Sequence, residues 1–190
     1  SQSESVKRRR DHFPGQYVHF PYDLSDLENL KGFFHEKIKP LCPIYGLVNN
    51  AAIAYDDLVT NARLERIRLM FQVNVFSSML LSKLVIRDMI LHGTKGSLVH
   101  ISSISANSGF RGLSMYASTK GAIESFSKGV AREWGPKGIR SNTVAPGFME
   151  TRMSASLGRE EMERIFRRTC LRKATEENSV AAMVEFLLSD

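Results

Sequence analysis

The residues most able to do chemistry in this sequence are a serine, a tyrosine and a lysine. Tyr116 and Lys120 are four residues apart, and Ser103 lies thirteen residues before the tyrosine. Residues four apart share one face of a helix, so the phenol and the ammonium would be neighbours. A nearby ammonium lowers the pKa of a phenol, which is otherwise about 10. The tyrosine could then exchange a proton with a carbonyl or alcohol oxygen, to which the serine could donate a hydrogen bond.

A tyrosine and a lysine at this spacing are more often an exposed pair, so the surrounding elements decide the interpretation. A short apolar run without alternation is typical of a strand buried on both faces of a parallel sheet, and residues 44–48 and 97–101 have this pattern. We also predict strands at residues 17–20, a short β-prone run, and at residues 140–144. Helical periodicity separates and follows them. The predicted helices are residues 26–39, with Ser25 as N-cap and Pro40 as stop, and residues 64–91, 116–134, 154–168 and 179–188.

Strands that alternate with helices predict an α/β fold with a doubly wound parallel sheet, covered by helices on both faces. In such a sheet, ligands bind beyond the carboxyl ends of the strands. The chain places unusual residues at those ends. Asp23 follows the first predicted strand, Asn49 the second, Ser103 the third, and Pro146 with Gly147 the fourth. This shared placement favours a ligand site built from all four.

Composition narrows the class of protein. The 190 residues suffice for one domain, and 43% hydrophobic with 24% charged residues exclude a disordered or fibrous chain. The net charge is +6, but 20 acidic residues lie among 26 basic ones, which favours a mixed solvated surface over a nucleic-acid partner. We find no apolar run of membrane-spanning length, no signal segment, and no metal or redox spacing around Cys42 and Cys170. These features predict a cytoplasmic protein without a metal and without a membrane partner.

Taken together, these residues resemble the classical short-chain dehydrogenase/reductase family over about residues 17–190. The resemblance rests on motifs in a fixed order: Asn49-Asn50-Ala51-Ala52, Asn74 between two valines, Ser103, Tyr116-Ala117-Ser118-Thr119-Lys120, and Pro146-Gly147 followed by Thr151. Residues 147–151 and 131–133 are closest in pattern to the bacterial 3-oxoacyl-(acyl carrier protein) reductases.

The resemblance implies a role for each catalytic candidate. Tyr116 would be the acid/base, and Lys120 would lower its pKa and hold the nicotinamide ribose. Ser103 would orient the substrate oxygen, and Asn74 would anchor a water in a proton relay to Lys120. Asn74 has apolar neighbours in the sequence, and a buried amide needs hydrogen-bond partners.

The resemblance also implies a Rossmann-like site for NAD(P), with NADP(H) favoured over NAD(H). Asp23 and Leu24 would meet the adenine, and Asn49 and Ala51 would line the adenosine ribose. The carboxamide side of the nicotinamide would be held by Pro146, Gly147, Met149 and Thr151. Tyr116 and Lys120 would contact the cofactor as well.

The sequence departs from the family at three places. Ala52 stands where the family usually has glycine. The first strands with their glycine-rich turn, and the last strand, are absent from this chain. We therefore expect residues 1–190 to be a single dinucleotide-binding and catalytic domain, incomplete at both ends. Within it, residues 152–170 would form a substrate lid whose side chains, such as Met153, Leu157 and Met162, set specificity.

Three functions remain open. The first is reduction of a ketone to a secondary alcohol, with a 3-oxoacyl thioester on acyl carrier protein as substrate. The second is a dehydrogenase of a sugar, sterol or other secondary alcohol, and the third is a non-catalytic binding or assembly subunit. An acidic carrier protein would be attracted by the positive charge, with Lys137 and Arg140 as candidate contacts.

The two longest predicted helices, residues 64–91 and 116–134, would form a homodimer or homotetramer interface. The first carries more apolar residues than one face against a sheet requires. They are Leu69, Phe76, Leu80, Leu81, Leu84, Val85 and Met89.

Overall fold

The computed structural model describes residues 16–41, 43–151, 154 and 158–189. Its sheet has three parallel strands in the order β1 (Gly46–Asn49), β2 (Ser97–Ile101) and β3 (Arg140–Val144). In the register of the sheet, Leu98 pairs with Leu47 on one side and with Ser141 on the other. The predicted parallel sheet is confirmed, and two of its strands begin and end where the sequence placed them.

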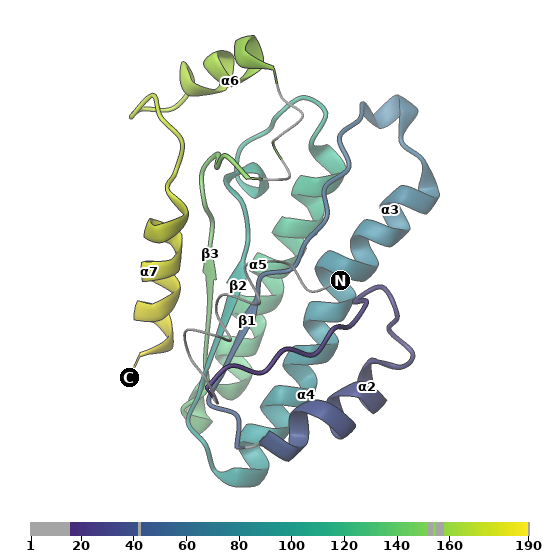
Figure 1. Cartoon of the computed structure of the whole chain (residues 1–190), viewed down its shortest axis with the longest axis vertical. Helices are drawn as coiled ribbons and strands as arrows, with labels where there is room; N and C mark the ends of the chain where they lie inside the picture. Colours follow the sequence, from purple (N-terminus) through teal and green to yellow (C-terminus); the bar gives the residue numbers. More distant parts are fainter. Residues whose placement is uncertain (1–15, 42, 152–153, 155–157, 190) are drawn as a thin grey trace.

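Helices cover the sheet on both faces (Figure 1). One face is covered by α4 (Ser77–His92) and α5 (Ser114–Trp134), with the short α2 (Leu30–Phe33) packed against α4. On the other face lies α7 (Glu177–Leu188), and α6 (Arg159–Phe166) lies beyond the carboxyl ends of the strands. The largest buried cluster fills the space between the sheet and α4 and α5; it includes Phe34, Val85, Ile86, Met89, Leu98, Val130 and Ile139.

One continuous helix runs from Leu64 to His92. It consists of α3 (Leu64–Phe71), a π-helical segment (Gln72–Phe76) and α4, and it ends at Gly93, whose φ of 65° only glycine adopts freely. By length and composition this helix could cross a membrane, with a mean hydropathy of 1.6 over its most apolar window. Our expectation that no such run exists was therefore wrong. Half of that window is buried inside the fold, as in the core helix of a globular domain.

The N-terminal part of the described chain differs from the prediction. Residues 17–20 form no strand, because no strand among the described residues lies beside them to share ladder hydrogen bonds. The next helix begins at Leu30 with Asn29, not Ser25, as its N-cap. The Asp23 carboxylate accepts hydrogen bonds from the N–H and hydroxyl of Ser25 (2.9 and 2.8 Å), which holds that residue in a turn.

The end of this helix and the bounds of a later helix also differ from the prediction. After α2 the chain continues through a π-helical segment (Phe34–Ile38) and a 3-10 turn (Lys39–Leu41), so Pro40 lies inside the last turn instead of stopping the helix. Of the helix predicted at 154–168, the structure shows α6 only. Residues 152, 153 and 155–157, which include Met153 and Leu157, lie outside the described residues.

Candidate active site

The first turns of α5 bring the predicted tyrosine and lysine together. Lys120 Nζ lies 5.6 Å from the centroid of the Tyr116 ring, as the four-residue spacing predicts. Lys120 is almost fully buried, and its Nζ donates a 2.7 Å hydrogen bond to the carbonyl oxygen of Ile101, the last residue of β2. Burial lowers the pKa of Lys120 to about 8. The end of the central strand therefore fixes the position of this ammonium.

The phenol of Tyr116 has a pKa raised above its ordinary value. Burial of the ring is the largest cause, the charge of Asp56 adds to it, and the hydrogen bond with the Ser103 hydroxyl acts in the opposite direction. We expected Lys120 to lower this pKa, but its ammonium is directed to the Ile101 carbonyl and does not offset the burial. At neutral pH Tyr116 is thus a protonated group, suited to give a proton to an oxygen.

Ser103 lies two residues after the end of β2 and is the N-cap of a 3-10 turn (Ile104–Ala106). The backbone on both sides of Ser103 is bonded to the chain leaving β3. The Ser102 N–H donates to the Val144 oxygen at 2.7 Å, and the Ile104 N–H donates to the Pro146 oxygen at 3.0 Å. These bonds hold Ser103 at the carboxyl end of the sheet, within hydrogen-bond reach of Tyr116.

Glu124 is a residue of this site that the sequence analysis missed. Its Oε1 accepts hydrogen bonds from the buried Ser102 hydroxyl (2.6 Å) and from Asn107 Nδ2 (3.2 Å). Glu124 therefore ties α5 to the loop that carries Ser103. A signal was present in the sequence, because Tyr116, Lys120 and Glu124 follow each other at four-residue intervals along one face of α5.

Asn74 lies in the π-helical segment and is buried, as predicted. Its Oδ1 accepts from the Ile53 N–H, and its Nδ2 donates to the Ile53 oxygen, both at 2.9 Å. The same Nδ2 donates to Thr119 Oγ1 at 3.1 Å, one residue before Lys120. The side chain therefore joins the loop after β1 to α5. A relay role through a water stays a prediction.

Of the four residues predicted to hold the adenosine, Asn49 and Asp23 make side-chain hydrogen bonds within the protein. Asn49 Nδ2 is turned toward the interior, 3.0 Å from His100 Nδ1 and 3.2 Å from Ser82 Oγ. Ala51 is exposed beyond the end of β1. Asp23 and Leu24 lie in the turn before α2, and hydrogen bonding to Ser25 lowers the pKa of the Asp23 carboxyl. No hydrogen bond found among the described residues links these four to Tyr116, Lys120 or Ser103.

The turn after β3 is held on both sides. Pro146 is buried with its carbonyl bonded to Ile104, and the Thr175 N–H donates to the Phe148 oxygen at 2.7 Å. A Cβ on Gly147 would lie 2.8 Å from Thr175 Oγ1, so Thr175 would have to shift to admit a side chain there. Ser154 Oγ lies between Met149 and Thr151, accepting from the Thr151 N–H at 2.8 Å and donating to the Met149 oxygen at 3.0 Å. All four predicted residues thus form one turn at the same sheet end as Ser103.

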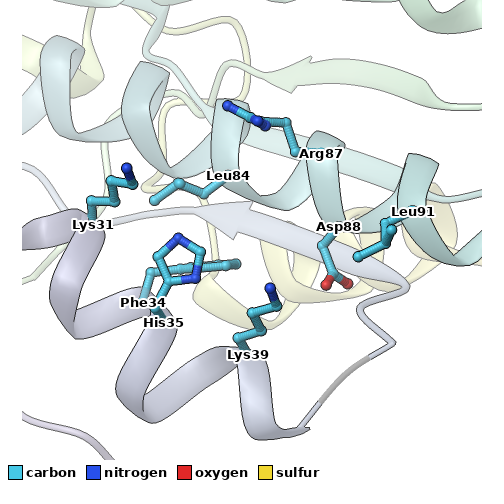
Figure 2. Close-up of a pocket in the computed structure, with 8 residues that line it drawn as sticks. All are labelled: Lys31, Phe34, His35, Lys39, Leu84, Arg87, Asp88 and Leu91. Carbon is cyan, nitrogen blue, oxygen red and sulfur yellow. The ribbon is translucent and has the colours of Figure 1, made fainter.

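A separate cavity of about 390 Å³ lies between α2 with its π-helical extension and α4 (Figure 2). Figure 2 shows the side chains of Lys31, His35 and Lys39 facing Leu84, Arg87 and Asp88 across it. Asp88 Oδ2 accepts from the N–H of Ile44, just before β1, so this cavity lies near the amino ends of the strands. It contains none of the predicted site residues.

Comparison with known proteins agrees with the fold. A family model described as enoyl-(acyl carrier protein) reductase matches residues 1–190. The 3-oxoacyl-[acyl-carrier-protein] reductase of Mus musculus is 35% identical over 174 residues, which is 92% of this chain and 72% of the mouse protein. Carbonyl reductase [NADPH] 2 of Sus scrofa is 37% identical over 150 residues, 78% of this chain and 62% of the pig protein.

A solved structure of a dehydrogenase has the same fold. A candidate NAD(P)-dependent gluconate 5-dehydrogenase from Beutenbergia cavernae, with NADP bound at low occupancy, superposes with a TM-score of 0.91 at 28% identity. The match covers 98% of this chain and 75% of that one. The parallel sheet and these matches together show a Rossmann-type oxidoreductase. The chain belongs to the short-chain dehydrogenase/reductase family of NAD(P)-dependent oxidoreductases.

Proposed function

We propose that this protein reduces a ketone to a secondary alcohol, and that its substrate is a 3-oxoacyl thioester carried by acyl carrier protein. The observation that carries this proposal is the placement of the Tyr116 phenol, which hydrogen bonds with the Ser103 hydroxyl and whose ring centroid lies 5.6 Å from Lys120 Nζ. A protonated phenol is the form that a carbonyl reduction needs, since the product oxygen must gain a proton.

Each residue has a defined task in this proposal. NADPH, when bound, supplies the hydride to the carbonyl carbon. Tyr116 gives its proton to the carbonyl oxygen, and Ser103 donates a hydrogen bond to the same oxygen. Lys120, whose Nζ lies 5.6 Å from the centroid of the Tyr116 ring, would hold the nicotinamide ribose. Asn74 keeps the helix turn that carries Lys120 joined to the loop after β1.

The described residues fit a nicotinamide cofactor at Lys120, which offers a buried ammonium for hydroxyl groups. Pro146, Gly147, Met149 and Thr151 would hold the nicotinamide side, and Asp23, Leu24, Asn49 and Ala51 the adenosine side. NADP(H) is our choice over NAD(H), supported by NADP in the related solved structure and NADPH in the name of the pig relative.

The names of the relatives support a carrier-bound substrate, but the contacts predicted for the carrier need correction. Arg140 is the first residue of β3, at the opposite end of the sheet from Tyr116, and its guanidinium donates to the carbonyl oxygens of Leu187 and Ser189 (2.9 and 2.6 Å). Lys137 lies in the turn just before β3, at the same end of the sheet as Arg140 and away from Tyr116. A carrier would instead meet basic residues in and after α6; they are Arg164, Arg167, Arg168, Arg172 and Lys173.

Residues 152–170 would act as the substrate lid of this single catalytic domain. In Figure 1, α6 lies above the carboxyl ends of the strands. Its Phe166 ring packs edge-to-face on Phe148, with centroids 5.8 Å apart, so this helix is attached to the turn after β3 by one ring contact. Met162, half-buried on α6, would face the substrate. We place the protein in the cytoplasm, where the exposed free thiol of Cys170 would stay reduced.

An assay with the purified full-length protein tests the proposed function. NADPH-dependent reduction of a 3-oxoacyl thioester should be observed, and Lys137→Ala, at the far end of the sheet, should leave its rate unchanged. A second candidate follows from the solved relative: oxidation of gluconate with NADP⁺. Turnover of gluconate without reduction of the thioester would replace our substrate, and absence of both would favour a non-catalytic binding or assembly role.

We further propose a homodimer or homotetramer through the long helix and α5. Leu64, Leu69 and Phe76 are 53%, 36% and 46% exposed on the long helix. A hollow of about 480 Å³ between its start and the start of α5 is lined by apolar side chains, including Ile67 and Met115. Val85 and Met89, which we counted toward this surface, are instead buried in the core.

Light scattering at micromolar concentration should give the mass of a dimer or tetramer. Phe76→Glu should shift the mass to that of a monomer, because the exposed ring would lie in the interface and a charge there would be desolvated. Phe186→Glu, on α7 and equally apolar at 70% exposure, is the matched control and should change nothing. A monomeric wild-type protein would refute the assembly.

A further inference from the structure

The hydroxyl of Ser103 has both of its acceptor positions occupied by one neighbouring residue. Ser105 donates to Ser103 Oγ twice, from its backbone N–H at 3.2 Å and from its hydroxyl at 2.9 Å. A serine hydroxyl has two acceptor lone pairs and one proton. With both lone pairs engaged, the proton is the only hydrogen-bonding group that Ser103 has left.

The loop around these two serines is held so that this arrangement persists. Ser105 is 4% exposed, so water does not compete for its hydroxyl. Ser102 and Asn107, which flank the pair, both donate to the Glu124 carboxylate on α5. The backbone N–H groups of Ser102 and Ile104 are bonded to the chain leaving β3. The Ser103 hydroxyl also hydrogen bonds with the Tyr116 phenol.

We propose that Ser105 is a positioning residue, which fixes Ser103 as a hydrogen-bond donor toward Tyr116 and the substrate oxygen. Without Ser105, the Ser103 hydroxyl could rotate and accept hydrogen bonds from the phenol or from water. A rotated Ser103 would not donate to the oxygen that becomes negatively charged during reduction. The inference rests on the proposed function, because it assigns Ser105 to the same acid/base group.

Steady-state kinetics give the first test. Ser105→Ala removes one of the two donors and should lower kcat about tenfold with little change in KM, as expected for one lost hydrogen bond that acts in the transition state. Ser105→Thr keeps the hydroxyl and should restore most of kcat. Ser108→Ala is the matched control, since this exposed serine lies in the same loop. Thermal unfolding of each variant shows whether the fold is intact.

A double-mutant cycle shows whether Ser105 acts through Ser103. In a Ser103→Ala background, Ser105→Ala should have no further effect on kcat, because the hydroxyl that it orients is gone. Equal losses in both backgrounds would overturn the proposal, since Ser105 would then act elsewhere. A Ser108→Ala variant as slow as Ser105→Ala would also overturn it, because the effect would belong to the loop in general.

A titration without cofactor or substrate separates this inference from the proposed function. The ultraviolet absorbance of the Tyr116 phenolate, obtained as the difference from a Tyr116→Phe protein, gives the pKa of that group. Donation from Ser103 lowers this pKa, so Ser105→Ala should raise it, while Ser108→Ala should not. An unchanged titration in Ser105→Ala contradicts the inference even if no substrate is ever reduced. A raised pKa supports it in a protein whose substrate proves to be different.

Discussion

Replacing Tyr116 with phenylalanine is expected to lower kcat by on the order of 10²-fold or more, which is the usual contribution of a positioned acid/base. The change removes one hydroxyl and almost no volume, so the thermal unfolding temperature should stay close to the wild-type value. The loss arises because the carbonyl oxygen would have no group to take a proton from. Steady-state reduction of the thioester measures the effect.

Two comparisons make this experiment specific. Tyr45→Phe removes the same hydroxyl group at the amino end of β1, far from the site, and should retain wild-type kcat. The affinity of Tyr116→Phe for NADPH, measured by NADPH fluorescence, should change much less than kcat does. If Tyr116→Phe turns over a good substrate at nearly the wild-type rate, the catalytic assignment is wrong.

Acidification is expected to destabilise the fold through His100, a fully buried residue of β2. Burial lowers its pKa from 6.5 to about 4. In the unfolded chain the pKa returns to its ordinary value, so between these limits the unfolded state binds a proton that the folded state does not. The contribution of His100 to the free energy of unfolding is therefore fully present above pH 6.5 and decreases as the pH falls toward 4. Over that range the loss would reach about 3 kcal/mol.

The network around His100 explains why a proton is poorly accommodated. Nδ1 accepts from Asn49 Nδ2, and Nε2 lies 3.4 Å from the Ser141 hydroxyl, which is 2.8 Å from Ser127. A proton on Nδ1 would point at the Asn49 donor. Urea unfolding at several pH values can isolate this effect by comparison with His100→Asn, whose amide oxygen can replace Nδ1 as acceptor. The stability difference between the two proteins should shrink as the pH falls.

The pH dependence of stability includes contributions from groups besides His100, so the comparison needs a control substitution at another histidine. His35→Asn, at an exposed position, should keep the pH dependence of the wild-type protein. A stability difference between wild type and His100→Asn that does not depend on pH would show that His100 does not titrate in this way.

The sequence predicted the sheet well because its signals were local and mutually consistent. Residues 97–101 are a short apolar run and residues 140–144 follow a helix that ends at Gly135-Pro136, and both are strands with the predicted bounds. Residues 17–20 looked similar but have no neighbouring strand among the described residues, and propensity alone does not form a ladder. Ser25 has good capping chemistry, yet its hydroxyl is taken by Asp23.

For the candidate site, too, features that depend on local spacing could be predicted and features that depend on tertiary contacts could not. The pairing of Tyr116 with Lys120 followed from helical spacing and could be predicted. The direction of the Lys120 ammonium could not, because it depends on which carbonyl ends the neighbouring strand, and so the pKa of Tyr116 was predicted in the wrong direction. The contact of Ser105 with Ser103 depends on the conformation of one turn, and residue type alone does not indicate it.

The π-helical segment at Gln72–Phe76 has a consequence for comparing this chain with others. A π-turn is equivalent to inserting one residue into an α-helix, which rotates everything after it by about 100°. The apolar stripes of α3 and α4 are therefore out of phase, and one heptad pattern drawn through residues 64–92 assigns the wrong face to half of the helix. In a homologue without the extra residue of the π-turn, α4 would be rotated relative to α3. Such a homologue would need apolar residues at different positions of α4 to face the core. Gap placement around Asn74 thus decides whether an alignment is structurally correct.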